Sequence, residues 1–203
     1  GANAYSLPTA SSSTLGGGAV YVSGGNFELS GSGLVENCTS INGGGVYVNN
    51  GDIIISSEGT VKGCKATSGG GMAVFSGNVT IDGGHLINNQ VSLTGGGIYA
   101  SSDTMNLLIS VLSGSINGNT TLGNGGAIGV EVGDGFAAHV VIGKEVCGGD
   151  DETHSHPIIK DNTATDNGGG IYLKGKDVTL DIYCGSLHQN IAINNAGSAD
   201  LDQ

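Results

Sequence analysis

The sequence predicts an all-β chain folded as a right-handed, single-stranded parallel β-helix, with about seven coils of about 26 residues each. A glycine motif that recurs at a regular spacing is the first observation behind this prediction. The second is that each copy of the motif is followed by short apolar runs separated by turn residues. Composition agrees, because 40 of the 203 residues are glycine and 37% are hydrophobic, too many for a disordered chain.

The glycine motif reads GGGVYV, GGGMAV, GGGIYA or GGGIYL in four of its six copies. Successive copies begin 26, 26, 26, 30 and 43 residues apart, a spacing typical of solenoids whose units bury a core only by stacking. Six residues before most copies stands an asparagine. We expect these positions to share one turn column, tolerant of positive φ, with side-chain amides bonded from coil to coil. The column holds Asn37, Gly63, Asn89, Asn119 and Asn162, with Asn190 in a final degraded copy.

Each copy contains three apolar runs and is expected to form three short strands and three turns. The first run follows the glycines and alternates, as in Val46-Tyr47-Val48, which predicts a half-buried strand. The second run reads DIIIS in one copy, and the third, such as GTVKG, precedes the asparagine. We expect one inward ladder from the first strands, formed by Val46, Met72, Ile98, Ile128 and Ile171.

The domain organisation follows from the repeat. Residues 1–16 are expected to form an N-terminal lead-in or cap, and residues 17–203 the β-helix domain. The 43-residue interval is interpreted as one coil with a loop inserted near residues 147–157, and two shorter coils are the alternative. The opening letters GANAYS are interpreted as a cloning remnant joined to part of a longer parent chain with other domains.

The charge balance excludes some partners. The chain has 18 acidic residues against 6 basic ones, all lysine, and a net charge of −12. Such a chain repels phosphate backbones, so we expect no nucleic-acid partner. No apolar run approaches the ~20 residues of a membrane span, so we expect no membrane insertion by this part of the protein.

Outward positions of the first strands predict a row of tyrosines with hollows at Ala73 and Gly129. Exposed tyrosine offers flat contact area at low entropic cost, so the row is a candidate binding platform. The alternative is that the rings only reinforce the sheet through cross-strand pairing. The row consists of Tyr21, Tyr47, Tyr99 and Tyr172.

The segment CGGDDETHSHP is the second candidate site. Its carboxylates and imidazoles are zinc or calcium ligand types, but their spacing matches no standard motif, so we expect no metal and no cofactor. We interpret it as a partner-binding loop, with a merely solvated acidic loop as the alternative. The residues concerned are Asp150, Asp151, Glu152, His154 and His156.

The four cysteines leave their disulfide state open. Cys38 and Cys64 lie 26 residues apart and are expected to stack as neighbours within disulfide range. Parallel Cβ directions favour two reduced thiols there instead. Cys147 and Cys184 could pair with each other.

Together, GGGIY or GGAIG and the asparagines before them resemble the repeat of the chlamydial polymorphic outer-membrane proteins, marked by GGA[ILV] and FxxN. Similar repeats occur in large surface proteins of other bacteria. The resemblance runs from about Gly17 to Asn195. It implies a non-enzymatic adhesin domain at the bacterial cell surface, hence extracellular, that binds a host protein or glycan. Host immunoglobulin enters as a partner by analogy, and no catalytic residue is carried over.

Two other functions remain as alternatives. β-Helices also serve as polysaccharide lyases and glycosidases, but this chain has no arginine to neutralise an acidic sugar. A glycosidase needs two carboxylates roughly 5 to 9.5 Å apart, and the outward acids Glu131 and Asp181 have no evident partner in the sequence. We therefore expect no enzyme. The second alternative is a passive stalk segment of a larger surface protein.

Overall fold

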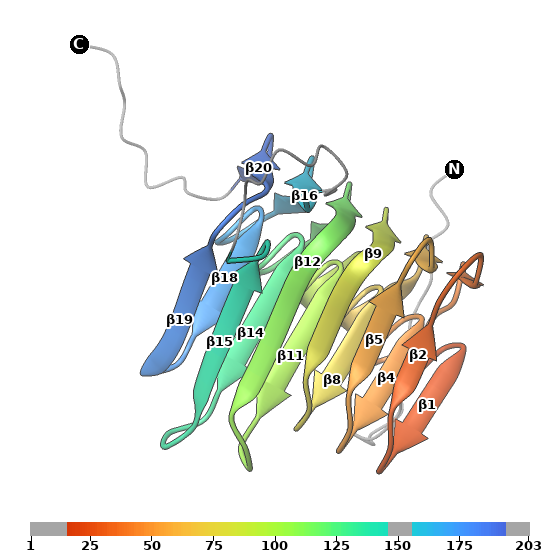
Figure 1. Ribbon diagram of the computed structural model, residues 1–203, viewed down its shortest axis with the longest axis horizontal. Coiled ribbons are helices and arrows are strands. Elements are labelled where there is room, and N and C mark those ends of the chain that lie inside the picture. The colour runs from red at the N-terminus through yellow and green to blue at the C-terminus, as the bar shows by residue number, and fades with distance from the viewer. Residues whose placement is uncertain (1–15, 146–155, 194–203) are drawn as a thin grey trace.

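The computed structural model describes residues 16–145 and 156–193. Within these ranges it contains 21 strands and no helix, and every strand pairing is parallel (Figure 1). Successive coils stack along one axis, so strands far apart in sequence lie side by side. The predicted all-β parallel β-helix is confirmed.

The first sheet consists of the strands that follow the glycine motifs, in the order β1-β4-β8-β11-β14-β18. Its register aligns the whole predicted inward ladder, from Val46 through Met72, Ile98 and Ile128 to Ile171. All of these except Ile171 are completely buried. The strands are β1 (Val20–Ser23), β4 (Val46–Asn49), β8 (Met72–Phe75), β11 (Ile98–Ser102), β14 (Ile128–Val132) and β18 (Ile171–Lys174).

The second sheet contains both the second and the third apolar runs of each copy. In two coils the runs join into one long strand, β9 or β12, that bends at a glycine: Gly83 has φ +92° and Gly114 has φ +91°. In the other coils the bend divides them. The strands are β2 (Phe27–Leu29), β3 (Leu34–Glu36), β5 (Ile53–Ser56), β6 (Thr60–Lys62), β9 (Val79–Ile87), β12 (Leu107–Asn117), β15 (Ala137–Ile142), β16 (Ile158–Lys160), β19 (Asp177–Ile182) and β20 (Ser186–His188).

The third sheet lies where the sequence predicted only turns, directly after the asparagine column. Its strands are short and mostly polar outside, and their inward positions hold small side chains such as Ala66, Thr121 and Ala164. An apolar-run criterion therefore misses them. The strands are β7 (Lys65–Ser68), β10 (Gln90–Thr94), β13 (Thr120–Thr121), β17 (Thr163–Ala164) and β21 (Ile191–Ala192).

The number of coils differs from the predicted value of about seven. The first sheet has six strands, so five turns lead from β1 to β18 in the part of the chain that the structure describes. The 43-residue interval is one coil, because Ile142 pairs with Val111 and Ile158 pairs with Ser115. Residues 143–157 thus take the place of residues 112–114 in the preceding coil, and two shorter coils are not formed.

Close stacking explains why the chain repeats its glycine motif. A Cβ added at Gly70 would lie 2.3 Å from the carbonyl oxygen of Gly96, and one at Gly96 would lie 2.2 Å from that of Gly126. Side chains are therefore excluded where the coils turn out of the third sheet. The turn lets one continuous core of β-branched residues form, in which each fully buried isoleucine contributes roughly 1.5–3 kcal/mol.

Candidate functional site

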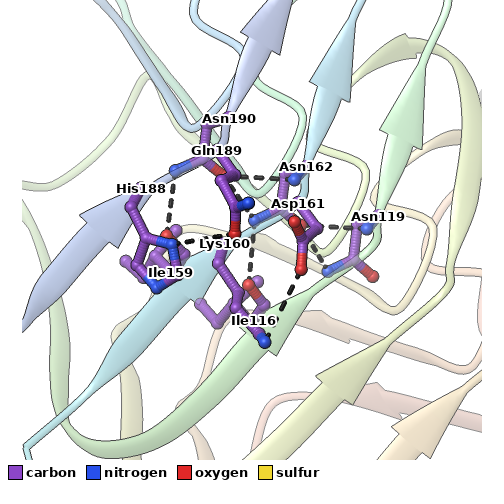
Figure 2. Close-up of polar contacts among 9 residues, drawn as sticks. All are labelled: Ile116, Asn119, Ile159, Lys160, Asp161, Asn162, His188, Gln189 and Asn190. Carbon is purple, nitrogen blue, oxygen red and sulfur yellow. Dashed lines mark hydrogen bonds and ion pairs between the residues drawn. The ribbon is translucent and has the colours of Figure 1, made fainter.

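A ladder of buried asparagines runs along the turn between the second and third sheets (Figure 2). The backbone N–H and the Nδ2 of Asn119 both donate to Oδ1 of Asn162, over 2.9 and 3.0 Å. Asn162 donates in the same way to Asn190, and Asn89 donates to Asn119. Each Nδ2 also donates to a backbone carbonyl in the preceding coil, as Asn119 does to Leu86 of β9. The predicted coil-to-coil amide ladder is confirmed for Asn89, Asn119 and Asn162.

The predicted place of Asn37 in this ladder is wrong. Asn37 lies one column earlier, beside Gly63 and Asn88, and it is these residues that adopt positive φ, at 56°, 62° and 54°. The ladder position is taken by Cys64, whose N–H donates to Oδ1 of Asn89. The cause is one extra residue in β10, between Val91 and Thr94, that β7 lacks. The ladder asparagine Asn89 therefore lies six residues before its glycine motif, whereas the equivalent position in the earlier coils lies five residues before it.

Two cysteines occupy the start of the ladder column. Cys38 and Cys64 are both free, and Cys64 is completely buried. Burial raises the pKa of the Cys64 thiol to about 11, and the neighbouring Cys38 makes smaller contributions. Cys184 is disulfide-bonded, whereas Cys147 lies outside the described residues. The pairing of these two therefore stays a prediction.

The tyrosine row has the predicted register but not the predicted exposure. Tyr21 and Tyr47 are stacked, with ring centroids 5.4 Å apart, yet Tyr21 is 51% exposed and Tyr47 only 6%. The hydroxyl of Tyr99 donates to Oε2 of Glu131 over 3.2 Å. Burial raises the pKa of Tyr99 to about 12, and the negative charge of Glu131 adds to the shift. Tyr172 is half-buried beyond Gly129.

Phe75 fills the hollow that the sequence placed at Ala73. Its ring centroid lies 5.4 Å from that of Tyr47 and 5.6 Å from that of Tyr99. The result is a continuous aromatic ladder of Tyr21, Tyr47, Phe75 and Tyr99. Sequence reasoning missed Phe75 because only one outward position per strand was followed. Two residues after Ala73 on the same strand, Phe75 faces the same side. This packing favours the structural interpretation of the row over the binding platform.

The candidate loop contributes little to the described structure. Asp150, Asp151, Glu152 and His154 lie outside the described residues, and His156 is exposed. Over the described ranges, no group of three or more histidine, cysteine or acidic side chains is arranged to hold a metal ion.

The outward acids considered for catalysis each contact a different kind of partner. Glu131 accepts the hydroxyl of Tyr99, and Asp181 lies 2.7 Å from Nε2 of His139. Asp134 forms an ion pair with Lys176. These contacts connect neighbouring coils across the outer surface, as ordinary cross-strand pairs do.

A Ser–His–Glu arrangement also lies on the outer face of the second sheet. Nδ1 of His85 is 2.8 Å from the hydroxyl of Ser115, and its Nε2 is 3.1 Å from Oε2 of Glu58. A histidine between a hydroxyl and a carboxylate is the arrangement that activates nucleophiles. The Glu58 side chain is largely exposed, so water screens its charge and weakens its effect on the imidazole. The contact is accounted for by the register, which stacks His85 beneath Ser115.

A groove on the outer face of the third sheet has the most distinctive surface chemistry. It encloses about 440 Å³, and its lining residues carry hydroxyl, amide and aliphatic groups. Lys65 is the one charged residue among the lining residues that the structure describes, which include no acid. Leu122, 68% exposed, and Ile193 add apolar surface. A smaller cavity of about 270 Å³ shares Thr39 and Lys65 with the groove. The groove is lined by residues including Gln90, Ser92, Thr120, Leu122, Thr163 and Thr165.

The fold and its ladders define a parallel β-solenoid repeat protein. One of its repeats, residues 158–174, matches the family model of the Chlamydia polymorphic membrane protein repeat. The match spans β16, β17 and β18 and includes ladder residue Asn162 and the glycine motif at Gly168. Neither a curated protein nor a solved structure matches the chain. The described residues contain no helix that is long and apolar enough to cross a membrane.

Proposed function

We propose that this chain is a non-enzymatic binding domain of the adhesin type, displayed outside a bacterial cell, that holds a host protein on its third sheet. The similarity of residues 158–174 to a membrane protein repeat supports the surface location. The outward acids considered for hydrolysis are each bonded to a hydroxyl or to a basic side chain, which supports binding without turnover.

The groove on the third sheet carries the proposal. The chain has a net charge of −12, yet no described lining residue of the groove is acidic. Leu122 and Ile193 give the lining of this groove exposed apolar surface, and apolar surface gathered in one hollow is typical of interaction sites. A partly apolar hollow without acidic residues, on a chain with a net negative charge, is therefore the surface on which binding costs a partner the least desolvation and the least charge repulsion.

An extended protein segment fits this groove better than a glycan. Sugar-binding surfaces commonly present aromatic rings, and the described lining of the groove contains none. Five stacked strands at ~4.8 Å spacing give a length of roughly 19 Å, enough for about six extended residues at ~3.3 Å each. Leu122 favours a segment that carries an apolar side chain at that point of the groove.

A panel of host serum proteins, immunoglobulin included, and host glycans tests the proposal with the purified 203-residue chain. Leu122→Asp adds a charge in the groove without disturbing the core. We expect it to weaken binding of the ligand found by tenfold or more, which is about 1.4 kcal/mol. Leu108→Asp is the matched control, because Leu108 is an exposed leucine on the second sheet.

The two variants separate the possible outcomes. Equal affinities for Leu122→Asp and the wild-type chain would contradict the groove as the site, and equal losses in both variants would indicate a general charge effect. Binding restricted to glycans would contradict the protein partner. A panel in which nothing binds would favour the passive stalk instead.

A further inference from the structure

Cys38 and Cys64 lie side by side in neighbouring coils. The register pair Glu36 and Lys62, two residues before them, and the bridge one residue after them give the two cysteines equivalent ladder positions. Each thiol donates to the carbonyl oxygen two residues before it, over 3.1 Å for Cys38 and 3.4 Å for Cys64. Because this contact repeats from coil to coil, the side chains are parallel, and their Sγ atoms lie about one coil rise apart, roughly 4.8 Å.

This separation suits a bridging metal ion better than a disulfide. A disulfide holds its sulfurs about 2.05 Å apart, so both side chains would have to leave their carbonyl contacts and move toward each other. The two thiols are free, although Cys184 of the same chain is disulfide-bonded. Two metal–thiolate bonds of ~2.3 Å, one on each side of an ion, span about 4.6 Å and match the stacked sulfurs as they stand.

The surroundings of the cysteine pair favour a soft, weakly hydrated ion. Cys64 is completely buried in the core and Cys38 packs against the same cluster, so water competes weakly for an ion between them. Burial raises the pKa of the Cys64 thiol, and the backbone N–H of Cys38 acts in the opposite direction because it favours the thiolate. The pair therefore combines an apolar setting with a donor that stabilises a thiolate.

A cavity of about 270 Å³ lies beside the pair. Its lining residues are the direct chain neighbours of the two cysteines, namely Asn37, Thr39, Gly63 and Lys65. Gly63 has no side chain there, whereas the equivalent residue of the next coil is Asn88. The cavity gives a small ion a route to within one residue of each cysteine.

We propose that Cys38 and Cys64 bind one monovalent copper ion, Cu(I), between their two sulfurs. Both thiols release their protons to water when the ion binds, and no electron is transferred. Soft thiolate ligands select Cu(I) over harder ions. Structural zinc takes four ligands, and over residues 16–145 and 156–193 no third histidine, cysteine or acidic side chain is placed to extend the pair. This site does not depend on the proposed binding function.

Anaerobic titration of the purified 203-residue chain with Cu(I), in competition with the chromogenic chelator bicinchoninate, tests the site. We expect one bound ion per chain, and copper X-ray absorption should show two sulfur neighbours. Cys38→Ala and Cys64→Ala should each weaken binding by about 100-fold or more, because even groups that only support a ligand contribute about 10- to 100-fold. Thr39→Ala, a matched cavity variant that keeps both thiols, should bind like the wild type.

Oxidation of the copper-free chain separates this site from a disulfide. Oxidised glutathione should leave Cys38 and Cys64 without a bond to each other, which mass spectrometry of their peptides measures. A disulfide between them would overturn the proposal, and so would a wild-type chain that binds no copper, or copper retained in both alanine variants. Cys38 is only partly buried, so Cys38→Ala keeps the test valid if the buried Cys64→Ala does not fold.

Discussion

At the ladder position, one asparagine side chain bonds three coils together. Asn89 accepts the N–H of Cys64, while its Nδ2 donates to Asn119 and to the carbonyl of Val61. Asn89 is completely buried, so water cannot replace any of these partners. A buried polar group left without its partner costs roughly 1–3 kcal/mol. Removing one side-chain amide from the ladder therefore leaves several hydrogen-bonding groups without a partner at once.

Asn89→Leu should lower the free energy of unfolding by about 3 kcal/mol or more, because it leaves the N–H of Cys64 and the carbonyl of Val61 unpaired. Asn50→Leu is the comparison. Asn50 lies in an exposed turn with φ 60°, and leucine there should cost only about 1–2 kcal/mol of backbone strain. Urea unfolding measures both. Equal losses would contradict the special position of Asn89.

Burial of Tyr99 and Cys64 should make the chain lose stability in alkali. The pKa of Tyr99 is raised from 10.0 to about 12, and that of Cys64 from 9.0 to about 11. Above the unfolded values, the unfolded chain releases these protons first, so stability is complete below about pH 9 and falls between about pH 9 and 12. Urea unfolding at stepped pH measures the fall, which Glu131→Gln should reduce. A flat profile over this window would contradict the buried positions.

At the scale of elements, the aromatic ladder ties four coils together on the outside of the first sheet. Tyr47 is enclosed between Tyr21 and Phe75, and Gly16 lies so close that a Cβ there would overlap the Tyr47 ring. The ring thus behaves as a second, smaller core on the outer face. The tyrosine row was predicted as a candidate binding platform, and the packing of Tyr47 indicates that it contributes to stability instead.

Tyr47→Ala should therefore cost roughly 2–4 kcal/mol of stability, in the range of buried aromatic truncations. Tyr21→Ala should cost less than about 1 kcal/mol, because Tyr21 is half exposed at the end of the ladder. Thermal unfolding compares the two. A Tyr47→Ala, Tyr99→Ala double variant should show a clear decrease in melting temperature, because Tyr47 is buried.

Some features of the structure follow from the spacing of the glycine motif and others do not. The stacking of the coils and the inward ladder recur with the glycine motif, so its regular spacing is enough to predict them. The third sheet escapes because its inward positions, such as Ala66 and Thr121, need only small side chains. The extra residue in β10 moves Asn37 out of the ladder without changing the 26-residue period. The groove lies on that unpredicted sheet, so sequence patterns could not locate it.

At the scale of the whole molecule, a solenoid is stabilised mainly by contacts between neighbouring coils. Interior coils have two neighbours, whereas the last coil has one among the described residues. Local opening should therefore start where burial is lowest, around Leu180 and Ile182, and reach the centre last.

Hydrogen exchange should show this gradient in the dilute chain. Amides of β8 and β11 should exchange most slowly, and those of β18, β19 and β20 fastest. Mass spectrometry of peptic fragments measures the rates. Uniform protection along a dilute chain would show that opening is global rather than stepwise.

At the bend of the second sheet between β15 and β16, the number of residues differs from that in the preceding coil without a change in strand pairing. Strand pairing is in register on both sides of residues 143–157, although the coil before has only residues 112–114 at that place. Sequence can therefore be gained or lost at this corner without shifting any ladder. At such a corner the length and sequence of the connecting segment can change while the β-helix scaffold stays constant. The same corner is therefore a suitable place to graft a foreign segment.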